Sequence, residues 1–317
     1  MVRFTVADSP PCVNKMAGPG PRKGHGVSER LFSAILRAMK GVIVAAGYGT
    51  RFLPVTKTIP KEMLPLVTRP SIDFIVEEFL ASGITDILFI TSRRKKSLED
   101  YFDREVELES VFKAAGDQKK LDKIAPSRAR CYFVRQPEMR GTGHALLLAR
   151  SFVGKEPFVV AYPDDLHFGE KPLARQLIET WEKTGCTVLA TLHDPPGINR
   201  YGVISIAADG LHVTGIVEKP AVGQEPSREA SIGRFLYTPD FLDQLASEWK
   251  EHREGEFFHT PAVLTLARQG KVVFRRVEGL RLDTGEPGGY LEAIIRYAQS
   301  VPELRAELDR ILEHRLP

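Results

Sequence analysis

Residues 40–65 read KGVIVAAGYGTRFLPVTKTIPKEMLP. The apolar run 41–46 predicts a buried strand, because it is short, continuous and bounded by turn residues. The Gly-Tyr-Gly turn at 47–49 then lets the backbone bend sharply and bring its N–H groups close to a ligand. Arg51 follows at once, and Lys61 lies further along the same stretch. Free backbone donors beside fixed cations are well suited to bind a polyphosphate.

The glycine spacing in this stretch disfavours two common phosphate-binding motifs. It matches neither the GxGxxG of a dinucleotide fold nor the GxxxxGK[ST] of a P-loop. A nicotinamide dehydrogenase is disfavoured further, because the ribose-binding acid expected downstream is absent. Taken alone, an ordinary glycine turn with solvated lysines would also account for the pattern, so the rest of the chain must decide.

Strands and helices alternate along the first two thirds of the chain. The patterns predict strands at 41–46, 86–91, 130–135, 157–162 and 186–192, and helices near 70–82, 95–103, 142–152 and 171–183. This alternation predicts an α/β fold with a mostly parallel, Rossmann-like sheet and helices on both faces. Ligands of such sheets bind beyond the carboxyl ends of the strands. The segments after residues 46, 135 and 162 should therefore meet at one edge.

The last third predicts a smaller antiparallel part. Residues 201–207 and 211–218 flank an Ala-Asp-Gly turn, which is typical of a hairpin. A further strand is expected at 272–277. Helices are expected near 259–268, 287–300 and 302–314.

Composition indicates a soluble globular protein. With 317 residues, 43% of them hydrophobic and 27% charged, the chain can form one large α/β domain. No apolar stretch approaches the roughly 20 residues of a membrane span. The cysteines Cys12, Cys131 and Cys186 are widely spaced and form no CxxC motif. We therefore expect neither a disulfide framework nor a zinc site, and we expect a cytoplasmic location.

Residues 1–38 differ from the remainder in composition. They are rich in Pro, Gly and polar residues and lack the apolar core of a secretion signal. We interpret 1–38 as a disordered or mistranslated leader, with a targeting or docking arm as the alternative, and 39–317 as the folded domain. Six basic and two acidic residues lie within 1–39, so this segment has a net charge of +4. The whole chain has a net charge of +3, so the remainder has a net charge near −1. The folded part therefore has no charge excess that would favour nucleic acid.

The full motif GxGTRxLP…K…PKEMLP resembles the start of the sugar-1-phosphate nucleotidylyltransferases, most closely the bacterial UTP–glucose-1-phosphate uridylyltransferases. The motif is long, and the resemblance continues in order to about residue 300. It implies that Gly47, Gly49 and Arg51 bind the nucleoside triphosphate and that Lys61 contacts its phosphates. The implied reaction joins UTP to glucose 1-phosphate and gives UDP-glucose and pyrophosphate.

Two acidic motifs resemble the metal site of that family. Pro163-Asp164-Asp165 follows a predicted strand, and Asp283 opens a Leu-Asp-Thr-Gly motif before a predicted helix. A plain turn or a helix cap could explain either motif alone. The resemblance makes Asp164 and Asp283 the carboxylate ligands of Mg²⁺, with Asp165 a lesser candidate. Mg²⁺ prefers such oxygen ligands together with phosphate oxygens.

Further motifs supply candidate contacts for the base and the sugar. The RQ…GTGHA segment resembles the family's base-binding segment, which makes Gln136 and Gly141 uracil contacts; an amide can pair with the imide edge of uracil. The neighbouring His144 is interpreted as a packing or capping residue. By resemblance, YGV and VEKP supply Gly202, Glu218 and Lys219 to the sugar and its phosphate, and a Gly-Glu segment supplies Glu256 to the sugar hydroxyls.

Two regions bear on specificity and assembly. Where the family commonly reads IQLTDA, residues 257–262 read FFHTPA, so the sugar is less certain than UTP. The charged insertion 104–129 resembles one typical of the uridylyltransferases, which implies that it covers the active site or makes subunit contacts; a solvated surface insertion would also explain its charges. We expect a homo-oligomer, a dimer or a tetramer. Alternatives are the same chemistry with another nucleotide or sugar, such as dTTP or mannose 1-phosphate, and a non-catalytic nucleotide-sugar sensor.

Overall fold

A computed structural model describes residues 39–313, and the predicted leader lies outside these residues. The apolar run before the glycine turn forms β1 (Lys40–Val44), in which Val42 and Ile43 are fully buried. Strand β1 pairs in parallel with β4 (Asp86–Thr91) and with β6 (Phe158–Ala161). The glycine loop therefore leaves the carboxyl end of a central strand, as predicted.

A nine-stranded sheet forms the centre of the fold. Its main path runs β10-β9-β11-β6-β1-β4-β5, and β8 pairs with both β11 and β12. Strand β1 is parallel to both of its neighbours, β4 is parallel to β5, and β8 is parallel to β12. Every partner of β11 is antiparallel to it. The remaining strands of this sheet are β5 (Arg130–Arg135), β8 (Thr187–His193), β9 (Gly202–Ile206), β10 (Val213–Glu218), β11 (Glu229–Tyr237) and β12 (Val272–Arg276). The predicted α/β fold with a mostly parallel sheet is confirmed.

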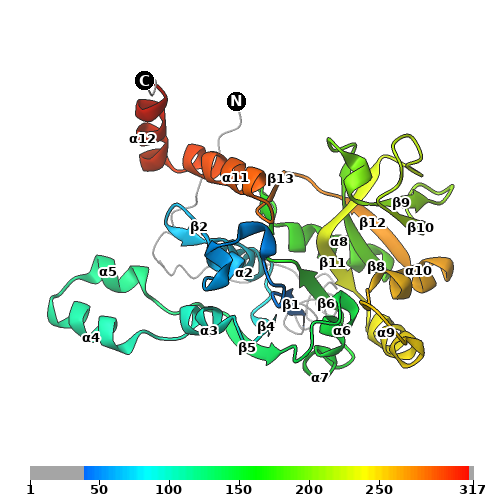
Figure 1. Ribbon diagram of the computed structural model, residues 1–317, viewed down its shortest axis with the longest axis horizontal. Coiled ribbons are helices and arrows are strands. Elements are labelled where there is room, and N and C mark those ends of the chain that lie inside the picture. The colour runs from blue at the N-terminus through cyan, green and yellow to red at the C-terminus, as the bar shows by residue number, and fades with distance from the viewer. Residues whose placement is uncertain (1–38, 314–317) are drawn as a thin grey trace, which may run out of the picture.

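Helices cover both faces of this sheet (Figure 1). One buried cluster unites the sheet with α2 (Ser71–Ala81), α3 (Lys96–Phe102), α8 (Leu173–Thr184) and α11 (Pro287–Ser300). A second cluster, on the other face, includes α6 (Thr142–Leu147), α7 (Arg150–Val153), α9 (Pro239–Glu251) and α10 (Thr260–Arg268). The predicted helix 142–152 is thus divided into α6 and α7, because Leu148 and Ala149 make tighter bonds to carbonyls three residues earlier.

A small two-stranded sheet was not predicted, although it is important for the site. Strand β7 (Asp165–Phe168) pairs antiparallel with β13 (Leu280–Asp283), and the register places Asp165 opposite Asp283. The two acidic motifs are more than 100 residues apart in the sequence. The pairing brings them to one place. A second small sheet joins β2 (Pro65–Leu66) to β3 (Arg69–Pro70).

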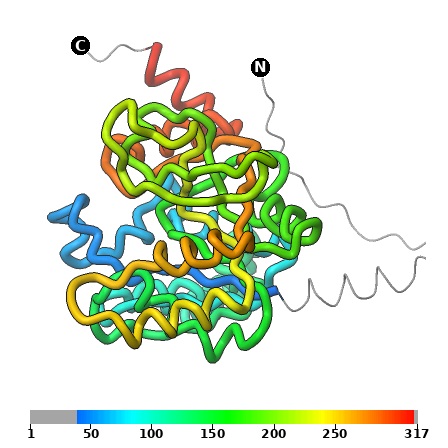
Figure 2. The backbone as a smooth tube through the Cα atoms, turned by 90° about the vertical axis from the view of Figure 1, so that its right-hand side faces the viewer, coloured from blue at the N-terminus to red at the C-terminus, as the bar shows by residue number. Residues whose placement is uncertain are grey.

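Two parts extend from the body of the molecule. The insertion forms α4 (Val106–Ala114) and α5 (Gln118–Lys123), which project as an arm in Figure 1. The last helix, α12 (Pro302–Glu313), has no buried residue and leads away from the body in Figure 2. Within residues 39–313, no helix has both the length and the apolar character needed to cross a membrane.

Candidate active site

The glycine loop after β1 is held against the PKEMLP segment. Gly49 has a φ of 69°, a left-handed conformation that favours glycine. A Cβ atom on Gly49 would lie 3.3 Å from the Thr56 methyl carbon and 3.4 Å from Cβ of Lys61. The Thr56 hydroxyl donates to the Gly49 carbonyl at 2.7 Å. This packing sets Lys61 beside the loop.

A buried ion pair fixes the segment that carries Lys61. The Lys95 ammonium lies 2.6 Å from a Glu62 carboxylate oxygen, and both residues are almost completely buried. Burial lowers the pKa of Lys95, and Glu62 opposes that effect. Ser71 also donates a hydrogen bond to the Glu62 carbonyl at 3.0 Å. We did not predict a role for Glu62, although its place beside Lys61 in PKEMLP was a signal.

Lys61 contacts the first predicted metal ligand directly. Its Nζ lies 2.5 Å from Asp164 Oδ2. Burial alone would raise the pKa of Asp164, but the Lys61 ammonium and its hydrogen bond lower it below the usual range. Asp164 is therefore ionised near neutral pH, and Lys61 is held where the glycine loop meets the end of β6.

Asp164 and Asp283 border the same small space. A Cβ atom on Gly285 would lie 2.6 Å from Asp164 Oδ2 and 3.0 Å from Asp283 Oδ1. Two carboxylates so close together, with oxygen donors only, fit a hard divalent cation. Residues 39–313 contain no group of three or more His, Cys, Asp or Glu side chains arranged for a metal ion. A cation here would therefore take its other ligands from water or a substrate.

Asp165 is committed to structural contacts. Its Oδ1 accepts from Arg281 Nε at 2.6 Å, and its Oδ2 accepts from the Gly233 amide at 2.6 Å. The same Arg281 donates to Asp283 at 3.1 Å and to the Tyr201 hydroxyl at 3.1 Å. Arg281 thus fixes Asp283 relative to the strand end. Sequence reasoning missed Arg281, because only the β7–β13 pairing shows what it contacts.

Most residues predicted to bind the triphosphate and the metal line one cavity, which Gly49 and Lys219 do not line. We name it the β1 cavity, and its wall includes Gly47, Arg51, Lys61, Asp164 and Asp283 together with Thr142 and Tyr162. Arg51 also approaches Glu286 at 3.9 Å. Three cations and four carboxylates therefore line a common space that could hold a metal-bound polyphosphate; the further three are Glu62, Asp165 and Arg281.

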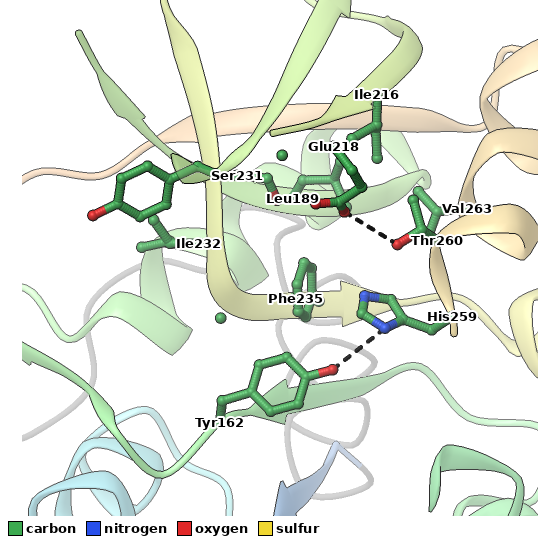
Figure 3. Close-up of a pocket in the computed structure, with 13 residues that line it drawn as sticks. Tyr162, Leu189, Ile216, Glu218, Ser231, Ile232, Phe235, His259, Thr260 and Val263 are labelled. Atoms are coloured by element: carbon green, nitrogen blue, oxygen red, sulfur yellow. Dashed lines mark hydrogen bonds between the residues drawn. The ribbon is translucent and has the colours of Figure 1, made fainter. Parts of the chain in front are cut away.

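Figure 3 shows a second cavity, the β10 cavity, which shares part of its wall with the first. Tyr162 and Gly233 line both cavities. Gly202 and Glu218 line the second, and they are paired across β9 and β10. A Cβ atom on Gly202 would lie 3.1 Å from Glu218 Oε1, so a side chain there would crowd the carboxylate.

Gln136 and Gly141 lie together but line neither cavity. Gln136 is buried, donates from Nε2 to the Gly141 carbonyl at 3.2 Å, and lies 3.1 Å from His144 Nδ1. Gly141 has a φ of 95°, and a Cβ atom there would meet the Phe257 carbonyl oxygen at 2.5 Å. His144 also packs on the Trp249 ring, which fits the interpretation of a packing residue.

Lys219 and Glu256 are exposed and also lie outside the lining of both cavities. Lys219 has a φ of 46°, which is uncommon for a residue with a side chain. Its backbone amide donates to the Tyr201 carbonyl at 3.0 Å. Within residues 39–313, the Lys219 ammonium has no ion-pair partner, so it is available to an anion.

Comparison with known proteins decides the family. The family described as Nucleotidyl transferase matches residues 40–300, most of the chain. The chain belongs to the nucleotidyl transferase family. Enzymes of this family generally use a divalent metal ion, which agrees with the carboxylate pair in the β1 cavity.

Curated relatives in the nucleotidyl transferase family cover the chain closely. UTP–glucose-1-phosphate uridylyltransferase 2 of Staphylococcus saprophyticus is 41% identical over 275 residues, 85% of this chain and 95% of its own. UTP–glucose-1-phosphate uridylyltransferase of Staphylococcus haemolyticus is 39% identical over 280 residues, 86% of this chain and 97% of its own. The predicted relation to bacterial uridylyltransferases is confirmed.

Solved structures of nucleotidyl transferases share the fold. UTP-bound UGPase from Acinetobacter baumannii superposes with a TM-score of 0.80 and 32% identity, over 88% of this chain and 99% of its own. A UDP-glucose pyrophosphorylase complexed with UDP-glucose superposes with a TM-score of 0.71 and 36% identity, over 83% of this chain and 99% of its own.

Proposed function

We propose that the protein transfers a uridylyl group from UTP to glucose 1-phosphate, giving UDP-glucose and pyrophosphate. Relatives at about 40% identity bear this activity in their names and match over almost their whole length. The observation that carries the chemistry is the pair of adjoining cavities. One presents cations and carboxylates, the other presents Glu218, and Tyr162 and Gly233 line both.

In the reaction, a phosphate oxygen of the sugar phosphate attacks the α-phosphorus of UTP. The bond between the α-phosphorus and the oxygen that bridges it to the β-phosphorus breaks, and pyrophosphate leaves with that oxygen. Arg51 and Lys61 hold the triphosphate, and Lys219 holds the sugar phosphate for in-line attack. Because two anions meet, positioning and charge stabilisation supply most of the rate enhancement.

Asp164 and Asp283 are the residues that would hold Mg²⁺. Their shared position beside Gly285 supports this assignment, as does the pKa of Asp164, which Lys61 lowers so that the carboxylate stays ionised. A bound Mg²⁺ offsets negative charge on phosphate oxygens during transfer. Arg281 keeps Asp283 in place, and the contact of Lys61 with Asp164 couples the triphosphate-binding lysine to the same carboxylate.

Base and sugar selection are assigned to separate segments. Gly47 and Gly49 bring backbone donors to the nucleotide, and Gln136 and Gly141 contact uracil. Gly202, Glu218 and Glu256 contact the glucose hydroxyls. Gly202 and Glu218 have direct support, because both line the β10 cavity.

Assembly and location complete the proposal. We propose a homo-oligomer, a dimer or a tetramer, in which the arm formed by α4 and α5 contacts another subunit. Exposed Val106, Leu108 and Val111 on this arm support such a contact. We propose a cytoplasmic location, and neither nucleic acid nor a membrane as a partner.

The test is pyrophosphate release across a panel of triphosphates and sugar 1-phosphates, with product identity checked by mass. UTP with glucose 1-phosphate should give the highest kcat/KM. Preference for dTTP or mannose 1-phosphate would replace the substrate pair and keep the chemistry. Binding of UDP-glucose without any pyrophosphate release would instead identify a nucleotide-sugar sensor.

A further inference from the structure

His259 lies at the boundary between the two cavities. It precedes α10 and lines the β10 cavity, within the segment 257–262 where the sequence departs from the family pattern. Its Nδ1 lies 2.9 Å from the Thr142 hydroxyl and 3.3 Å from the Tyr162 hydroxyl. Thr142 lines the β1 cavity and Tyr162 lines both. Two hydroxyl groups thus hold the Nδ1 edge of the imidazole ring.

The environment of His259 determines its charge. The ring packs among Tyr162, Phe235 and Tyr237, with its centroid 5.2 Å from that of Phe235. Burial lowers the pKa of His259 to about 4, so the ring is neutral near neutral pH. A neutral imidazole carries its proton on one nitrogen and accepts on the other.

The tautomer decides what His259 presents to the β10 cavity. A hydroxyl group can donate to a ring nitrogen or accept from it; when Thr142 and Tyr162 donate to Nδ1, the neutral ring carries its hydrogen on Nε2. Figure 3 shows the second ring nitrogen pointing away from Tyr162, into the space below Glu218. In this tautomer, His259 presents an N–H donor to the β10 cavity.

An acceptor lies on the opposite side of this cavity. The Glu218 carboxylate lines it, and the Thr260 hydroxyl donates to Glu218 Oε1 at 3.4 Å. Much of the remaining wall is apolar, with Leu189, Ile216 and Val263. A neutral donor opposite an anionic acceptor, between apolar walls, suits a polyol ring that both donates and accepts hydrogen bonds.

We infer that His259 is a sugar-binding residue whose Nε2–H donates to one hydroxyl of the sugar 1-phosphate, and that Thr260 positions Glu218 to accept from another. This inference rests on the proposed function and adds a specificity determinant to it. Thr142, which lines the β1 cavity, also contacts His259. This contact fixes the position of the His259 ring relative to the proposed triphosphate site.

The test is steady-state kinetics of the full chain with UTP and glucose 1-phosphates that each lack one hydroxyl. In the wild type, the analogue without the hydroxyl bound by His259 should lose about tenfold or more in kcat/KM. His259→Leu should lose the same factor with glucose 1-phosphate and nothing further with that analogue. KM for UTP should stay within about twofold of the wild-type value. A general structural defect would raise KM for UTP as well.

Two further variants keep the result interpretable. His212→Leu is the matched control, because His212 lies at the far turn of the β9–β10 hairpin and contacts Asp209. It should keep the wild-type discrimination. His259→Gln retains an amide donor and should recover part of the loss, and it replaces His259→Leu if that variant does not fold.

The outcomes separate the two proposals. An inactive wild type with UTP and glucose 1-phosphate would remove the proposed function. A second outcome is that the wild type is active and each deoxy analogue loses the same factor in kcat/KM in His259→Leu as in the wild type. That result would overturn only the present inference. A parallel change of KM for UTP, KM for the sugar phosphate and Tm would overturn it as well.

Discussion

The β1 cavity and the β10 cavity are built in different ways. Most of the charged wall of the β1 cavity comes from a short continuous segment and two strand ends. The buried Lys95 and the half-buried Arg281 fix this wall. The β10 cavity combines β9, β10, β11 and the start of α10. Its polar groups are few, and His259 and Thr260 belong to a segment that departs from the family pattern.

Under the proposed function, the difference between the two cavities separates phosphate chemistry from the choice of sugar. Phosphate chemistry needs a rigid arrangement of charges, because electrostatic stabilisation depends on preorganised groups. Sugar choice needs only a few hydrogen bonds inside an apolar wall, and single substitutions can change it. Substitutions in the β1 cavity should therefore affect turnover or stability strongly, and those in the β10 cavity should change substrate preference.

The largest effect should come from the buried pair beneath the β1 cavity. Lys95→Met leaves the Glu62 carboxylate buried without its partner, which should cost about 3–5 kcal/mol. Urea unfolding measures this loss. Lys171→Met is the control, because Lys171 forms an exposed pair with Glu179 that is worth about 0–1 kcal/mol. Equal losses in both variants would show that the pair does not anchor the segment.

Asp164→Asn should lower kcat by about a hundredfold, or about 2.7 kcal/mol, because it removes a charged group at the reacting phosphates. Turnover is measured at saturating UTP over a Mg²⁺ titration. Asp243→Asn, an exposed acid on α9, should remain near wild type. Normal Mg²⁺-dependent turnover of Asp164→Asn would exclude Asp164 as the main ligand.

Selection of the base should have a smaller effect on the rate than the loss of a metal ligand. UTP should exceed GTP and ATP by at least about tenfold in kcat/KM, or about 1.4 kcal/mol, because the proposed uracil contacts are few, Gln136 and Gly141. Substrate competition in one vessel measures the ratio. Gln136→Leu should reduce it, whereas equal use of GTP by the wild type would contradict the assignment.

The smallest effect concerns the pH dependence of stability. The pKa of His259 is lowered from 6.5 to about 4 in the folded protein, so between these values the unfolded state binds more protons. The stability that neutral His259 contributes is therefore complete above pH 6.5 and is lost as the pH falls toward 4. The decline of Tm between pH 7 and pH 5 should be about 2 °C smaller in His259→Leu than in the wild type. Identical slopes would show that His259 titrates normally.

Much of the parallel sheet could be predicted from the sequence. Strands β1, β4, β6 and β8 are short apolar runs that are buried on both faces, so hydrophobic pattern and turn residues define them. Because their order in the chain implies a parallel sheet, the meeting of the glycine loop with Asp164 followed directly. Both features depend on local sequence.

Strand β11 could not be predicted, because its buried charges depend on distant partners. Arg234 is fully buried and pairs with Glu78 at 2.8 Å, and buried Glu229 accepts from Thr191 and Arg276. In sequence, such residues indicate an exposed segment. The roles of Arg281 and His259 were missed for the same reason, since each is defined by contacts with residues far along the chain.

The most direct test of the central claim follows the label of UTP into the products. UTP labelled at the α-phosphorus or at the β-phosphorus is incubated with glucose 1-phosphate and Mg²⁺. We predict that the α-label appears in UDP-glucose and the β-label in pyrophosphate, one for one. Release of the α-label as UMP or UDP, or no α-label in a nucleotide sugar, would contradict the account.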